Sequence, residues 1–155
     1  NVINVGSQVK FSIKNFGLNV GGSFSGVEGK IVFDPANLSN ASFTVSVNAE
    51  SINTNNGSRD KHLKKEDYFD VAKYPKLTFA STKVSGNAGT YTIEGTLTIK
   101  GVSKKISFPF TAMATSDGYH FGGQFTLNRR DFNVGGSSWT LSDELTVSLN
   151  ISAIK

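Results

Sequence analysis

Strict alternation of apolar and polar residues is the feature that most constrains how this chain can fold. The alternating segments are residues 9–14, 43–49, 91–100, 106–110, 121–127 and 145–152. A period of two with one polar face is typical of antiparallel strands that bury a single face. Turn-forming residues at 34–35, 85–87, 100–101, 116–118 and 135–136 separate the segments.

These patterns predict an all-β protein. About eight antiparallel strands with polar outer faces fit an up-and-down β-barrel, in which closure also removes exposed edges. A sandwich of two sheets is the alternative architecture. The chain has 155 residues, of which 18% are charged and 12 are Phe, so a folded chain with a sizeable core is expected. We predict a single domain that spans residues 1–155.

Charge and composition limit the partners and the compartment only weakly. The net charge of +4 permits an anionic partner without requiring one. The absence of Cys removes disulfide and thiol chemistry. No apolar run is long enough to span a membrane, so stable membrane insertion is not expected. Because the sequence begins at Asn1 rather than Met, we expect that an export signal has been removed.

Residues 58–79 interrupt the alternation with a cluster of charges. Ser58 or Asp60 can cap a short helix, because their side-chain oxygens accept the free N–H groups of its first turn. Leu63 and Phe69 are too far apart for one strong helical stripe, so the sequence predicts a short helical insertion near residues 59–72. An insertion of this kind between strands can close one end of a barrel.

No catalytic or metal-binding constellation surrounds His62 and His120, the two histidines. The HExxH motif, the phosphate-binding loop and the GxSxG nucleophile elbow are all absent. We therefore predict that His62 is structural or exposed, with a hydrolase that uses His62 as the weakest alternative. The nearby acidic residues, among them Glu66 and Asp70, are predicted to form a solvated surface. No enzyme activity, catalytic residue or metal is expected.

Nucleic-acid binding is not expected either. It requires clustered basic residues with stacking aromatic side chains on an exposed face. Here the basic pairs are short, and the aromatic residues alternate toward the interior.

The nature of the interior stays open at this point. A barrel of about eight strands can fill itself with side chains or leave room for one small ligand. A filled barrel would act as a structural or protein-interaction module, whereas a hollow barrel would bind an apolar molecule. Alternation alone does not distinguish an apolar wall from a packed core.

A linked series of short motifs resembles the YceI-like family of bacterial proteins. The motifs are GVEG (26–29), FDP (33–35), SINT (51–54), RDKHL (59–63), YFDV (68–71), YPKLTF (74–79), GTLTIKGV (95–102) and LNRRDF (127–132). Their order and spacing cover nearly the whole chain. Gly6-Ser7 and Asn15 depart from the family, whose members often have a His-Ser pair and a further His at these positions.

The resemblance implies a lipocalin-like barrel in a periplasmic or secreted protein, holding a long apolar molecule such as a polyisoprenoid, an isoprenoid quinone or a fatty-acid derivative. The expected role is storage or transport of that lipid, with no other cofactor. Leu63 and Phe69 would turn inward to seal the barrel, and Trp139 can belong to the core, the rim or the wall. The predicted wall residues are Phe11, Ile13, Phe24, Phe33, Phe43, Val45, Phe79, Ile93, Leu97, Phe108, Phe125 and Leu127.

Overall fold

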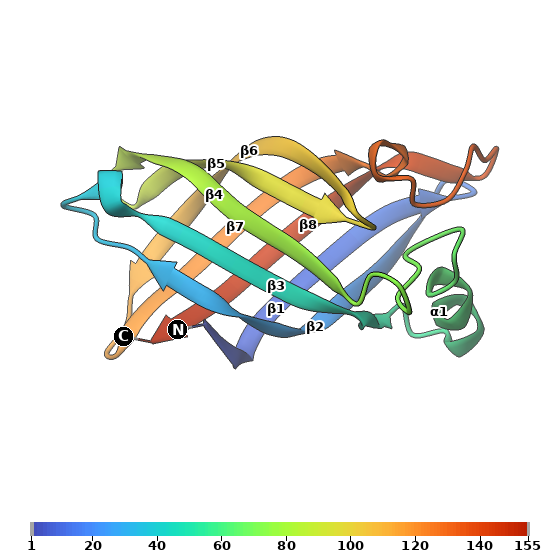
Figure 1. Cartoon of the computed structure of the whole chain (residues 1–155), viewed down its shortest axis with the longest axis horizontal. Helices are drawn as coiled ribbons and strands as arrows, with labels where there is room; N and C mark the ends of the chain where they lie inside the picture. Colours follow the sequence, from blue (N-terminus) through green and yellow to red (C-terminus); the bar gives the residue numbers. More distant parts are fainter. Residues whose placement is uncertain (1, 155) are drawn as a thin grey trace.

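The computed structural model describes residues 2–154 as a closed antiparallel barrel in which each strand pairs with its neighbours in the sequence (Figure 1). The elements are β1 (Val2–Asn15), β2 (Leu18–Val32), η1 (Leu38–Asn40), β3 (Ser42–Asn53), α1 (Gly57–Leu63), β4 (Lys76–Asn87), β5 (Thr90–Ile99), β6 (Val102–Ala114), β7 (Gly118–Asn128), η2 (Arg129–Phe132) and β8 (Leu141–Ile154). Pairing of β1 with β8 closes the sheet. The predicted eight-stranded up-and-down barrel is therefore confirmed.

Strand β3 shows how the alternation produces this fold. Phe43, Val47 and Ala49 are buried inside the barrel, whereas Thr44 and Asn48 are exposed on its outer surface. Successive side chains of a strand point to opposite faces, so a period of two commits one face of the sheet to the interior. When the sheet curls until β8 meets β1, the apolar faces of the strands enclose a common core.

The turn predicted at residues 85–87 is misplaced. Strand β4 continues through these residues, and the hairpin turns at Ala88 and Gly89, whose φ angles are 54° and 85°. Gly86 lies within the strand at φ 117°, and a Cβ atom there would lie 2.6 Å from the carbonyl oxygen of Thr90. The glycine therefore serves a close approach between strands, a role that sequence alone does not separate from a turn.

The predicted helical insertion between β3 and β4 is present, but its cap is Asn56, not Ser58 or Asp60. The Asn56 side chain accepts a hydrogen bond from the Arg59 N–H. The Asp60 carboxylate instead accepts one from the Thr54 N–H at 2.9 Å, and the Arg59 guanidinium donates to the Thr54 hydroxyl and carbonyl, both at 2.8 Å. These bonds hold α1 against the end of β3. Among residues 2–154 no helix is both long and apolar enough to cross a membrane.

The two ends of the barrel are closed differently. The α1 end carries the β1–β2 turn, the α1 insertion, the β5–β6 turn and the η2 connection (Figure 1). The opposite end is filled by a cluster that we call the aromatic plug, which consists of Phe33, Phe43, Tyr91, Phe110, Tyr119 and Phe121. Ring centroids in this cluster lie 5.1–6.2 Å from Phe33, in edge-to-face arrangements that favour aromatic packing.

Candidate functional site

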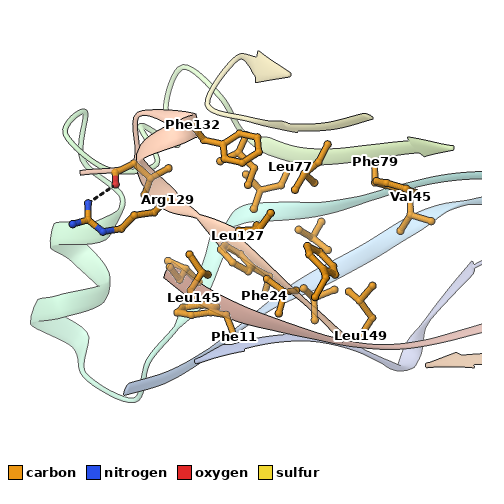
Figure 2. A pocket seen from close by; sticks show the side chains of 18 of the residues that line it. Phe11, Phe24, Val45, Leu77, Phe79, Leu127, Arg129, Phe132, Leu145 and Leu149 are labelled. Carbon is orange, nitrogen blue, oxygen red and sulfur yellow. Dashed lines mark hydrogen bonds between the residues drawn. The ribbon is translucent and has the colours of Figure 1, made fainter. Parts of the chain in front are cut away.

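An apolar cavity of about 260 Å³ lies inside the barrel between the aromatic plug and the α1 end (Figure 2). All eight strands contribute to its wall, and side chains from the α1 insertion and the η2 connection close around it. The interior is therefore hollow. A barrel packed with side chains along its whole axis would have no such space, so the filled-barrel alternative does not describe this interior.

Every predicted wall residue except Phe33 lines this cavity. The residues placed there are Phe11, Ile13, Phe24, Phe43, Val45, Leu63, Phe69, Phe79, Ile93, Leu97, Phe108, Phe125 and Leu127. The placement of Phe33 in the wall was wrong. Strand β2 ends at Val32, so the chain leaves the sheet before Phe33, and the Phe33 ring lies across the end of the barrel in the aromatic plug.

Two wall residues pack against glycines of the neighbouring strand, Gly22 directly across from Phe11 and Gly95 diagonally from Phe79. A Cβ atom on Gly22 would lie 2.2 Å from the Phe11 ring, and one on Gly95 would lie 2.5 Å from the Phe79 ring. The tip of each ring therefore packs against the backbone of the neighbouring strand at the glycine, in space that a side chain there would occupy.

Apolar side chains from two connections cover the α1 end of the cavity. Leu63 and Phe69 come from the α1 insertion, and both line the cavity, as predicted for them. The Phe69 ring packs edge-on against Phe24 of the wall, with centroids 5.5 Å apart. Phe132 and Val134 of the η2 connection are buried beside them. Together these residues shield the apolar interior from water at this end.

Arg129 is a buried cation that the sequence reasoning did not single out; its only signal was its place in the LNRRDF motif. Its side chain is 4% exposed and lies at the edge of the cavity lining, with the guanidinium pointing away from the apolar side chains (Figure 2). Nε donates to the Ser142 carbonyl at 3.0 Å, Nη1 to the Val134 carbonyl at 2.9 Å, and Nη2 to the Asp143 carboxylate at 3.3 Å. Because these groups satisfy its donors, Arg129 fastens the η2 connection to the start of β8.

The polar part of the lining is concentrated at the α1 end. Asn15, Thr54, Arg59 and Arg129 contribute there, and the remaining polar side chains of the lining lie in the β3–β4 wall. Asn15 is one of the positions at which the sequence was expected to depart from the family pattern. Ser7, another position of that departure, is buried and accepts a hydrogen bond from the Ser152 N–H at 3.0 Å.

Neither of the two histidines lines the cavity. The His62 ring lies 5.0 Å from Tyr68, between centroids, and does not line the cavity. Among the described residues, no group of three His, Cys, Asp or Glu side chains could hold a metal ion. A hydrogen bond from the Lys76 ammonium lowers the pKa of the Glu28 carboxyl, but both side chains are exposed on the outside of the barrel.

A closed eight-stranded antiparallel barrel around an apolar cavity defines a lipocalin-like binding fold. The family model of the YceI-like domain matches residues 1–153. The chain therefore belongs to the YceI-like family.

Individual relatives agree with this assignment. The chain is 32% identical to UPF0312 protein YE1254 of Yersinia enterocolitica over 95% of this chain and 80% of that protein. The crystal structure of BcnA from Burkholderia cenocepacia superposes with a TM-score of 0.93 at 25% identity, covering 99% of both chains. A polyisoprenoid binding domain from Saccharophagus degradans, 14% identical, has the same fold, with a TM-score of 0.80 over 97% of this chain and 94% of that domain.

Proposed function

We propose that this protein binds a long apolar lipid, such as a polyisoprenoid, an isoprenoid quinone or a fatty-acid derivative, inside the barrel and carries or stores it without chemical change. The continuous apolar cavity between the aromatic plug and the α1 end is the observation that carries this proposal. The protein would need no cofactor other than its lipid.

Apolar burial would drive the binding. Each buried CH₂ group contributes about 0.8 kcal/mol, so a chain of about ten such groups gains roughly 8 kcal/mol before losses. The lost freedom of a flexible ligand offsets a large part of this gain. A wall of Phe, Leu, Ile and Val side chains selects for length and shape and discriminates weakly between chemical identities, so related lipids should compete for the site.

The family supports the same ligand class. The Saccharophagus degradans domain is described as binding a polyisoprenoid, and it shares this barrel. The concentration of polar lining at the α1 end suits a ligand whose polar group lies there and whose apolar tail points toward the plug. We propose that the protein carries this lipid through the aqueous space of the periplasm or outside the cell.

Extraction of the purified protein with organic solvent, followed by mass spectrometry, tests the proposal. We expect a long-chain apolar lipid in an amount comparable to that of the protein. A matched sample of an unrelated barrel purified in parallel gives the background. Absence of any lipid above that background, combined with failure to bind added isoprenoid quinone, would contradict the proposed function.

We predict that His62→Ala leaves the extracted lipid unchanged and that the wild-type protein does not hydrolyse a nitrophenyl ester above the buffer rate. The reason is that His62 lies outside the cavity and contacts Tyr68 rather than a nucleophile. Ester turnover that His62→Ala abolishes in a folded protein would replace the carrier with a hydrolase.

A further inference from the structure

Three large apolar side chains are exposed at the α1 end of the barrel. Phe16 is 76% exposed, Leu18 is 72% exposed and Trp139 is fully exposed. The Phe16 N–H donates to the Thr140 carbonyl at 2.8 Å, so the β1–β2 turn and the loop before β8 lie together. We call Phe16, Leu18 and Trp139 the apolar tip. Trp139 therefore belongs to neither the core nor the cavity wall.

The backbone of the β1–β2 turn places Phe16 at an unusual position. Phe16 and Gly17 have φ angles of 54° and 75°, the left-handed conformation that a type I′ hairpin turn requires at both central positions. Asn, Asp or Gly usually occupies the first of these positions, and a bulky residue there is strained. An aromatic side chain in this turn raises the conformational energy and gains no burial within the protein.

The apolar tip adjoins the cavity. Asn15, next to Phe16, lines the cavity and pairs with Leu18 across the hairpin and with Leu141 of β8. Val20 and Leu141, close to the tip in β2 and β8, also line the cavity. The exposed side chains therefore stand at the rim of the end where the polar lining is concentrated.

The two ends of the barrel also differ in the charge of their connections. The connections at the α1 end are residues 16–17, 54–75, 100–101 and 129–140, and those at the opposite end are residues 33–41, 88–89 and 115–117. In the connections at the α1 end, Lys and Arg outnumber Asp and Glu by eight to five. The exposed charged residues there are Lys61, Lys65, Lys73 and Arg130 on the basic side and Glu66, Asp67 and Asp131 on the acidic side. At the opposite end, the charged residues of the connections are Asp34 and Asp117.

We propose that the α1 end docks on an anionic phospholipid bilayer, with the apolar tip inserted into the interface and the basic connections against the headgroups. Aromatic side chains, above all Trp, are favoured at the membrane interface. Basic residues beside exposed apolar ones add attraction to anionic lipids. Docking in this orientation points the rim of the cavity at the bilayer. Its use for loading lipid depends on the proposed function, but the docking itself does not.

Trp139 is the only tryptophan, so its fluorescence reports directly on the tip. We expect vesicles of phosphatidylcholine with phosphatidylglycerol to shift its emission to shorter wavelength, and added salt to weaken the effect. The double variant Phe16→Ser/Leu18→Ser keeps the probe and should bind these vesicles at least about tenfold more weakly, because it loses two inserted apolar side chains. Met113→Ser is the matched control, since Met113 is 70% exposed at the opposite end of the barrel.

The outcomes separate docking from lipid carriage. The double variant should keep its circular dichroism spectrum and its extracted lipid, because neither Phe16 nor Leu18 lines the cavity. Unchanged Trp139 emission with the anionic vesicles would overturn the docking proposal. A blue shift that appears without vesicles as protein concentration rises would also overturn it, in favour of self-association. Failure to extract lipid from a protein that still binds vesicles would contradict the proposed function alone.

Discussion

Val45→Glu is expected to reduce the extracted lipid to background. Val45 lies in β3, lines the cavity and pairs with Phe79 of β4, which also lines it. The substitution would place a carboxylate against the apolar ligand with no cation beside it, and an unpaired buried charge costs several kcal/mol. That cost is comparable with the net affinity left after the ligand's lost freedom is subtracted. Lipid is measured by mass spectrometry on equal amounts of folded protein.

Thr44→Glu is the matched control for this experiment. Thr44 is the preceding residue of β3, but its side chain is exposed on the outside of the barrel, so the same new charge stays in water. We expect this variant to keep its lipid. Val45→Trp gives a second comparison, because it fills the cavity without adding charge and should also lower the lipid content. If both Val45 variants retained wild-type lipid, the ligand would lie outside the barrel.

Arg129→Met should lower the free energy of unfolding by about 3 kcal/mol, which corresponds to a fall of roughly 1–2 M in the urea midpoint. The variant leaves the carbonyl oxygens of Val134 and Ser142 without their donor. A buried polar group left without its partner costs about 1–3 kcal/mol. The Asp143 carboxylate adds little to this cost, because it is 48% exposed and water can replace the lost cation.

Arg130→Ala provides the control for Arg129, because the neighbouring arginine is exposed. We expect the stability of this variant to lie within about 0.5 kcal/mol of wild type. If Arg129→Met were as stable as Arg130→Ala, the hydrogen bonds of Arg129 would not hold the η2 connection in place. A preserved fold with a faster loss of lipid would still agree with a role for this connection in covering the cavity.

Alternation predicted the barrel and most of its cavity wall, because both depend on the same physical property. Residues such as Phe43 and Val45 face inward wherever their strand runs, so their role follows from the period of the strand alone. Phe33 was misplaced for the same reason. It follows Ile31 at the spacing of a strand, but the sheet has already ended, and local pattern does not show where pairing stops.

The features that the sequence did not predict depend on contacts between distant segments. Arg129 gains its role from carbonyl groups at positions 134 and 142, which only the folded η2 connection brings within reach. The packing of the Phe11 ring in the wall likewise depends on Gly22, which lies across a strand pair. The exposure of Phe16 depends on where β1 turns. None of these relationships has a periodic signature.

The aromatic plug has a consequence for the order of events in the proposed carrier. Because the aromatic rings around Phe33 close one end of the barrel, the cavity is a blind pocket that a ligand can reach only from the α1 end. A long-chain lipid would then enter such a pocket with its apolar tail leading and leave it with its polar group leading, both times through the α1 end. Uptake and release of the lipid would therefore use the same opening, so a donor and an acceptor membrane could not both be in contact with that opening at the same time. The distance from the opening to the aromatic plug would limit the length of lipid tail that can be enclosed, and a longer tail would extend out of the cavity.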